Sequence, residues 1–226
     1  SYSEAPAIQL PDLRGGTALI TGASRGIGRA VVAALAAHDV RCFALADQGF
    51  GADLPPQIVP IPCDLGDAGT IEQILAIIMA QTESLDYLVN VAGIDPKYRL
   101  EEGTVDRWDS IVDLNLRAYY LLIRGCLPLM RRGRGRSIVN VSSINYRLGI
   151  VGRSIYSTTK AGILGLTTGL ARELGHDAIR INTVSPGWVF TERQISEYYS
   201  GPDAEKHLAR LAEKQALALH IDLPER

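Results

Sequence analysis

The chain has 226 residues, 46% hydrophobic and 21% charged, which suffices to bury one core and excludes a disordered or fibrous protein. Its 23 basic and 25 acidic residues leave a net charge of -2, so bulk charge gives no reason to bind nucleic acid or an anionic membrane. No apolar run approaches the roughly 18 to 20 residues of a membrane helix, and the three cysteines lack CxxC spacing, so we expect a cytoplasmic protein with a small-molecule partner and no metal.

Residues 1–14 are polar and contain Pro6 and Pro11, and we expect them to form a flexible N-terminal arm. An apolar run at residues 17–20 then leads into a glycine-rich turn, and residues 27–37 carry apolar side chains at helical spacing. A strand, a turn and a helix in this order make up the first half of a βαβ unit.

The same alternation continues along the chain. The short apolar runs predict buried strands at residues 40–46, 58–61, 87–91, 137–141 and 179–184. Longer periodic segments predict helices at residues 68–82, 105–130 and 155–174. The pattern indicates one α/β domain over residues 15–226, a doubly wound, Rossmann-like parallel sheet with helices on both faces. Such sheets bind ligands beyond the carboxyl ends of their strands.

The glycine turn reads Thr21-Gly22-Ala23-Ser24-Arg25-Gly26-Ile27-Gly28 and opens a helix. The N–H groups and the dipole at a helix start favour a pyrophosphate, and glycines let a dinucleotide approach the main chain closely. The spacing is GxxxGxG, so this motif alone is also compatible with a simple tight turn.

Asp47 ends the second predicted strand, 19 positions after Gly28 (47 minus 28), close to the spacing of about 20 at which an acidic residue meets the adenosine ribose. This spacing favours NAD, with NADP as the alternative. Arg25 points the other way, because a guanidinium suits a 2′-phosphate. Ala46 could instead occupy the discriminating position, with Asp47 only capping a turn.

Tyr156 and Lys160 lie one helical turn apart, where the ammonium favours the tyrosinate. A phenol with an ordinary pKa of about 10 needs such help to act as a base. Taken alone, this pair is more often a solvated helix pair than a catalytic one. Ser143 lies 13 positions before Tyr156 (156 minus 143) and could hold a substrate oxygen. Ser142 competes for that role, and both serines could simply cap a turn.

Together these residues resemble the short-chain dehydrogenase/reductase family, including its 3-oxoacyl reductase and sugar dehydrogenase members. The resemblance covers roughly residues 15 to 224 and adds Asn90-Val91-Ala92-Gly93, Asn115 and Pro186-Gly187 to the motifs above. This combination is far more specific than any one motif. It implies an NAD(P)-dependent oxidoreductase that moves a hydride between nicotinamide and a secondary alcohol or ketone.

The resemblance implies a catalytic tetrad of Asn115, Ser143, Tyr156 and Lys160. Tyr156 would be the acid/base, and Ser143 would hydrogen-bond the reacting oxygen. Lys160 would also grip the nicotinamide ribose. Asn115 would steady a helix kink and a proton-relaying water, the plain alternative being a buried, satisfied amide.

The implied cofactor contacts extend over the whole family motif set. Asp64 would contact the adenine, Asn90 the adenosine-side ribose, and Val189 and Thr191 the carboxamide. The full cofactor set is Gly22, Ser24, Arg25, Gly26, Ile27, Gly28, Asp47, Asp64, Leu65, Asn90, Ala92, Gly93, Tyr156, Lys160, Pro186, Gly187, Val189 and Thr191. The substrate set is Ser143, Asn145, Tyr156 and Trp188.

The sequence departs from the family pattern in two places. Val91 stands where the usual motif has a second Asn, a change that we expect to be tolerated. Similar proteins continue beyond the position of Arg226 to a seventh strand, so we expect that strand to be missing and the domain to be incomplete at its C-terminal end. The resemblance also implies a homo-oligomer, either a tetramer or a dimer.

Residues 186–194 resemble a segment of sugar-oxidising members, and Glu192, Arg193 and Gln194 could hydrogen-bond a polyol. We therefore predict a sugar or polyol substrate, with a 3-oxoacyl thioester as the alternative; a mobile lid with solvated charges is the structural alternative. A non-catalytic NAD(H) sensor is a further alternative, although a sensor would not need the tetrad. The arginine-rich residues 131–136 are expected to form a solvated turn rather than an RNA-binding patch.

Overall fold

The computed structural model describes residues 13–51, 53–198, 200, 203–206 and 209. The chain divides into two compact units, residues 12–187 and a second unit of residues 188–226 with residues 1–11. Most of the predicted arm and the C-terminal end of the chain lie outside the described residues. The arm and the missing seventh strand therefore stay predictions.

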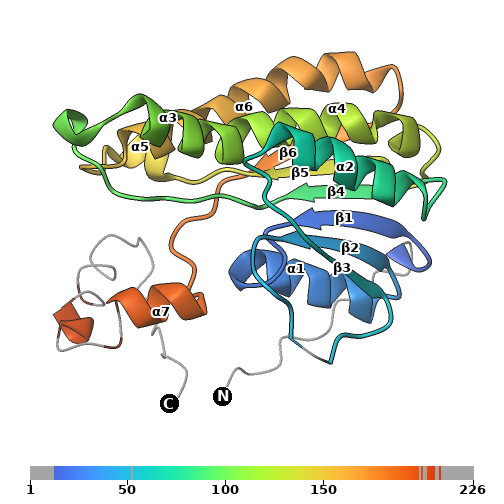
Figure 1. The fold of residues 1–226 in the computed structure, drawn as a ribbon, viewed down its shortest axis with the longest axis horizontal. Coiled ribbons are helices and arrows are strands. Elements are labelled where there is room, and N and C mark those ends of the chain that lie inside the picture. The colour runs from blue at the N-terminus through green and yellow to red at the C-terminus, as the bar shows by residue number, and fades with distance from the viewer. Residues whose placement is uncertain (1–12, 52, 199, 201–202, 207–208, 210–226) are drawn as a thin grey trace. The chain divides into compact units, whose positions relative to one another are not determined.

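The first unit is built on a sheet of six strands in the order β3-β2-β1-β4-β5-β6 (Figure 1). The strands are β1 (Thr17–Thr21), β2 (Arg41–Ala46), β3 (Ile58–Pro62), β4 (Tyr87–Asn90), β5 (Ser137–Val141) and β6 (Arg180–Val184). Every pairing is parallel. The strand order reverses between β1 and β4, which is where open sheets of this kind bind ligands. The predicted doubly wound sheet is confirmed.

Helices cover both faces of this sheet. They are α1 (Gly26–Ala37), α2 (Ala68–Met79), α3 (Val105–Val112), α4 (Ala118–Met130), α5 (Asn145–Leu148) and α6 (Ser154–Gly175). The side chains of β1 alternate between two cores, as the period of a strand requires. Leu19 packs in a core with α2 and α4, whereas Ala18 and Ile20 pack in a second core with Val32 of α1.

The helix predicted at residues 105–130 is interrupted. A π-helical turn, η3 (Asp113–Arg117), separates α3 from α4 and carries Asn115. The amide of Asn115 hydrogen-bonds main-chain atoms of Ile94, outside the helix. Apolar periodicity continues on both sides of η3, so the pattern could not reveal it. Turns of this type are frequent at functional sites.

The described residues also form short helices that the sequence did not predict. They include α5, the 3₁₀ turn η2 (Leu100–Glu102), and α7 (Glu192–Tyr198) in the second unit. Each is too short to give a clear helical period. In the second unit, the Thr191 hydroxyl accepts a hydrogen bond from the Gln194 N–H at 3.3 Å at the start of α7. The segment interpreted as a substrate lid is therefore partly helical.

The three cysteines are free thiols, with Cys42 and Cys126 buried and Cys63 half-buried. Burial raises the pKa of Cys42 and of Cys126 to about 12, and that of Cys63 to about 11. None is therefore a thiolate at neutral pH. In the part of the chain that the structure describes, no helix could span a membrane and no metal-ligating cluster occurs.

Candidate active site

The glycine turn fits a phosphate-bearing ligand. Gly22 has a φ of +63° and a Cβ on it would lie 3.0 Å from the Ala92 nitrogen, while a Cβ on Gly28 would lie 2.0 Å from the Gly22 oxygen. These two positions of the turn therefore have no room for a side chain, and their main chain is not covered by one. Arg25 precedes α1, and its side chain makes no capping hydrogen bond to the first N–H groups of the helix. Ser24, Gly26 and Ile27 are half-buried around this turn.

Thr21, at the end of β1, is a structural part of this turn that the sequence did not single out. Its hydroxyl oxygen accepts hydrogen bonds from the N–H groups of Val91 and Ala92 at 2.8 and 3.0 Å. This links the ends of β1 and β4 and sets Gly22 against Ala92. A buried threonine just before a glycine turn could have indicated this role, because its hydroxyl needs a partner.

Asn90 lies in a buried polar ladder rather than on an open surface. Its Nδ2 donates to Asn140 Oδ1 at 2.9 Å, and Asn140 Nδ2 donates to Thr167 Oγ1 at 3.0 Å. Thr183 continues the ladder from β6 with a 2.7 Å bond to Thr167. Asn90 thus joins β4 to β5 and α6, and its contact with a cofactor stays a prediction.

Asp47 is exposed immediately after β2, whereas Ala46 is buried with 3% of its surface accessible. The Ala23 N–H donates to the Leu45 carbonyl at 2.9 Å, so the glycine turn lies beside the end of β2. This geometry favours Asp47 over Ala46 as the side chain that reaches a ribose. Arg25 is also exposed, so it stays a competing influence.

Asp64 and Leu65 follow β3 and have different environments. Asp64 is exposed and its Oδ1 accepts a hydrogen bond from the Gly66 N–H at 2.8 Å. Leu65 is buried in the core that contains α2 and α4. The side chain of Leu65 therefore packs in the core, and a contact of this residue with a cofactor stays a prediction.

Asn115 is fully buried on η3 and uses its whole amide. Its Oδ1 accepts from the Ile94 N–H at 2.9 Å, and its Nδ2 donates to the Ile94 carbonyl at 2.8 Å. A Cβ on Gly93 would come within 3.1 Å of Asn115 Oδ1 and 3.5 Å of Lys160 Nζ. Asn115 therefore fixes the segment after β4 close to the predicted catalytic lysine.

Tyr156 and Lys160 lie on α6, with Lys160 Nζ 5.7 Å from the centre of the Tyr156 ring. Lys160 is only 3% exposed, and its ammonium donates to the Val141 carbonyl at 3.0 Å. Burial lowers the pKa of Lys160 to about 8, against an opposing effect of Asp95. A buried lysine poised near neutrality beside a half-buried tyrosine is typical of an acid/base site.

Tyr119 of α4 packs against the same ammonium, which lies 5.6 Å from its ring centre. Its hydroxyl is within hydrogen-bond distance of the Ala92 and Val141 carbonyls, at 3.1 and 3.3 Å. Burial raises the pKa of Tyr119, as does a charge on Tyr156. Tyr119 is therefore uncharged and packs beside Lys160 as part of the site. Nothing in the sequence around Tyr119 indicated this role.

The structure distinguishes the two serines that follow β5. Ser142 is buried and donates its hydroxyl to the Lys160 carbonyl at 2.6 Å, so it holds α6 in place. Ser143 is half-buried and its Oγ accepts from the Asn145 N–H at 3.2 Å, which leaves its proton outside that bond. Asn145, also half-buried, begins α5 beside it. Ser143 is thus the serine suited to a substrate oxygen.

Pro186 belongs to the first unit, and its carbonyl accepts from the Ile144 N–H at 3.1 Å, beside Ser143. Gly187 ends this unit. Trp188, Val189 and Thr191 belong to the second unit, where Trp188 and Val189 are exposed. Their predicted contacts with cofactor and substrate stay predictions.

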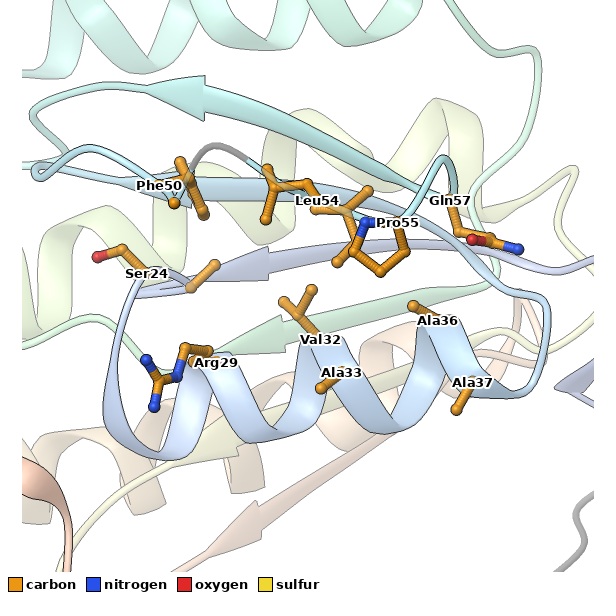
Figure 2. A pocket seen from close by; sticks show the side chains of 13 residues that line it. Ser24, Arg29, Val32, Ala33, Ala36, Ala37, Phe50, Leu54, Pro55 and Gln57 are labelled. Carbon is orange, nitrogen blue, oxygen red and sulfur yellow. The ribbon is translucent and has the colours of Figure 1, made fainter.

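A separate cavity of about 590 Å³ runs along α1. Figure 2 shows Val32 and Ala36 of α1 facing Phe50, Leu54 and Pro55 from the connection between β2 and β3. Within its described residues this connection has no helix, although parallel strands are usually joined through one. The cavity touches the glycine turn at Ala23 and Ser24. None of the four predicted catalytic residues lines it.

Sequence comparisons connect this geometry to known proteins. A family profile described as short chain dehydrogenase matches residues 16–199. The chain is 36% identical to the "Probable galactose dehydrogenase GalD" of Rhizobium meliloti, over 94% of this chain and 85% of that protein. It is 34% identical to the 3-oxoacyl-[acyl-carrier-protein] reductase FabG of Staphylococcus aureus, over 78% of this chain and 75% of that protein.

A solved structure agrees with both the fold and these relatives. The aldohexose dehydrogenase of Thermoplasma acidophilum, in its ligand-free form, matches with a TM-score of 0.80 at 29% identity. The match covers 90% of this chain and 80% of that one.

Proposed function

The chain belongs to the short-chain dehydrogenase family and is an NAD(P)-dependent oxidoreductase acting on CH–OH groups, and we propose that its substrate is an aldose or related polyol and that NAD is its preferred cofactor. The observation that carries the catalytic part is the buried Lys160 ammonium beside the Tyr156 ring. Taking an ammonium out of water is unfavourable, so its retention there supports a functional role.

The cofactor is held by main chain more than by side chains. The bare glycine turn and the start of α1 suit the pyrophosphate, and the exposed Asp47 suits the adenosine ribose. Lys160 and Gly93 lie where the nicotinamide end would follow. When bound, the nicotinamide accepts a hydride from the CH–OH carbon, or returns one to a carbonyl.

The chain's own residues handle the oxygen and its proton. Ser143 donates a hydrogen bond to the substrate oxygen and so orients it. Tyr156 removes the hydroxyl proton as the alcohol becomes a carbonyl, and returns it in the reverse direction. Lys160, as an ammonium, favours the tyrosinate form that this step needs. Asn115 holds the segment after β4 in place close to Lys160.

The sugar assignment is supported by relatives and by one segment. The R. meliloti relative carries a galactose dehydrogenase name, and the T. acidophilum structure is an aldohexose dehydrogenase. In the second unit, Trp188 is exposed, and an indole ring of this kind can pack on sugar carbons, while Glu192 and Arg193 are residue types that bind hydroxyls.

Reduction of a 3-oxoacyl thioester is the second candidate. The FabG relative supports it, at nearly the same identity as the galactose dehydrogenase. A non-catalytic NAD(H) sensor is the third candidate, but a sensor would not require Ser143 after β5 together with Tyr156 and Lys160 on α6. We also propose a cytoplasmic homo-oligomer, tetramer or dimer. Light scattering of the purified protein tests the oligomer.

The test is a matched panel of aldoses, polyols and short 3-oxoacyl thioesters with both cofactors. Absorbance of the reduced nicotinamide at its usual wavelength reports turnover. The proposal expects the highest kcat/KM for an aldose with NAD. Faster turnover of the thioesters supports the second candidate instead, and binding of cofactor without turnover of any compound supports the sensor.

A further inference from the structure

Two charged residues that the family motifs do not include, Arg153 and Asp95, form an ion pair at the start of α6, the helix that carries the predicted catalytic tyrosine. Arg153 precedes α6, three positions before Tyr156, and its Nη1 lies 2.9 Å from Asp95 Oδ2. The side chains are only 9% and 19% exposed, so this ion pair is mostly out of water. Removing one partner of a partly buried ion pair is costly, because the other charge then lacks compensation away from water.

The ion pair joins two segments of the site. Asp95 follows Ile94, the residue whose main chain Asn115 binds from both sides. Beside it, the Tyr98 N–H donates to the Gly152 carbonyl at 2.9 Å. The segment after β4 is thereby fastened to the turn that starts α6, and this turn sets the position of Tyr156.

The ion pair also places a positive charge near Tyr156. The Arg153 guanidinium carbon lies 5.9 Å from the centre of the Tyr156 ring, nearly the distance of the Lys160 ammonium. Asp95 acts in the opposite sense and raises the pKa of Lys160 against the effect of burial. Arg153 therefore favours loss of a proton from the pair of Tyr156 and Lys160, and Asp95 opposes it.

We infer that Arg153, held in place by Asp95, is a positioning residue that fixes the start of α6 and sets the pH range in which Tyr156 accepts a proton. The inference rests on the proposed function, because it needs Tyr156 to be the base. Tyrosine and lysine exchange protons as one coupled unit, so a neighbouring cation makes proton loss from the unit easier and a neighbouring anion makes it harder.

Other charged and titratable groups surround α6 and enter the same balance. Arg107 of α3 lies over the Tyr98 ring at 4.3 Å, Arg117 pairs with Asp113 at 2.8 Å, and Arg147 lies over the Tyr146 ring at 5.3 Å. Tyr119 packs on the Lys160 ammonium. Further charged groups on the neighbouring elements include Lys97, Asp106, Asp109 and Arg180. The variants below leave all of them unchanged.

The experiment measures kcat/KM for alcohol oxidation against pH in Arg153→Gln, Asp95→Asn and the double variant, with Arg153→Lys as the conservative control. Arg153→Gln removes a cation while the Asp95 carboxylate keeps its charge, so the acidic limb of the profile should move to higher pH by about 0.5 to 1 unit. Asp95→Asn should move the limb to lower pH by a similar amount. The double variant should show a limb near that of the wild type but a lower maximal rate, and Arg153→Lys should restore most of the wild-type profile.

Opposite displacements by the two single variants are the signature of the inferred role, because a merely structural pair would lower the rate without moving the limb. Limbs that stay fixed, or that move in the same direction, overturn the inference. Each variant is checked for cofactor affinity and melting temperature. If one single variant fails to fold, the displacement of the limb in the other single variant decides, because its direction is predicted separately. Tyr156→Phe is assayed alongside: its retained turnover would refute the proposed function itself, whereas its inactivity with fixed limbs refutes only the role of Arg153.

Discussion

The side-chain amide of Asn115 binds the main chain of Ile94 through both of its ends, at 2.9 Å for the accepted bond and 2.8 Å for the donated one. An amide is the side chain that can do this, since it presents one acceptor and a donor in fixed geometry. The π-helical turn η3 carries Asn115 to that position. Asn115 thus joins the π-helical turn η3 to the segment that follows β4, close to Lys160.

Asn115→Ala should destabilise the protein and reduce turnover. It leaves the Ile94 N–H and carbonyl without these partners, which costs about 2 to 4 kcal/mol for two bonds. Denaturant unfolding measures this loss. Gln81→Ala is the control, because the bond that it removes, from Arg41 to the Gln81 side-chain oxygen, is exposed, and its loss should cost at most about 0.5 kcal/mol. Equal effects of the two variants would contradict the role given to Asn115.

Much of this architecture could be predicted from the sequence, since short apolar runs alternate with periodic segments and the observed strands begin and end close to the predicted ones. The glycine turn at the start of a helix and the helix that carries Tyr156 and Lys160 were also predictable from local pattern, whereas the catalytic roles of Ser143, Tyr156 and Lys160 come from the family resemblance and stay predictions. The ambiguity between Ser142 and Ser143 was not resolvable from sequence. The difference between the two serines is that the Ser142 hydroxyl binds the Lys160 carbonyl of α6, which is a tertiary contact.

The parts that could not be predicted are contacts between distant segments. Thr21 looks like an ordinary strand residue until its hydroxyl is seen to bind Val91 and Ala92. The pairing of Arg153 with Asp95 has no sequence pattern, and each residue alone resembles a solvated loop charge. Leu65 was predicted as a cofactor contact, yet its side chain fills the core.

Lys160→Met should stabilise the protein without cofactor. The pKa of Lys160 is lowered to about 8 in the folded state, so between that value and its ordinary 10.5 the unfolded chain binds more protons. The free energy of unfolding of the wild-type protein therefore rises with pH between about 8 and 10.5. Below pH 8 Lys160 is charged in both states, and the folded state bears the full cost of burying that charge. The variant should gain about 1 to 3 kcal/mol at pH 7.

Denaturant unfolding of wild type and Lys160→Met at pH 7 and at about pH 10 checks this claim. The Val141 carbonyl still has the Tyr119 hydroxyl nearby at 3.3 Å, so the substitution does not leave it without a donor. The gain should shrink at the higher pH, where the wild-type lysine is neutral in the folded state. A less stable variant at pH 7 would show that the ammonium is not buried as described.

Asp47→Ala should narrow the preference for NAD over NADP. The carboxylate accepts ribose hydroxyls and repels a 2′-phosphate, and one charge-assisted hydrogen bond corresponds to roughly a tenfold change or more. The measurement is the ratio of kcat/KM for the two cofactors in wild type and variant. Preference for NADP by the wild-type protein would mean that Arg25 outweighs Asp47.

Gly28→Ala should abolish cofactor binding and destabilise the fold. The added Cβ would lie 2.0 Å from the Gly22 oxygen, which is main chain and part of the predicted pyrophosphate site. Gly69→Ala in α2 is the matched control, because its Cβ would meet only Asp67 at an ordinary 3.4 Å. The control should be neutral or more stable by up to about 1 kcal/mol. Unchanged cofactor affinity in Gly28→Ala, measured by calorimetry, would rule out this site.

The central claim is that Tyr156 takes the proton while a hydride leaves the substrate carbon. An aldose that carries deuterium on the reacting carbon is incubated with the oxidised cofactor, and the reduced nicotinamide is examined by NMR. The wild-type protein should transfer the label to one face of the nicotinamide, and Tyr156→Phe should bind the cofactor with similar affinity but transfer none. Transfer of the label by Tyr156→Phe at the wild-type rate would contradict the account.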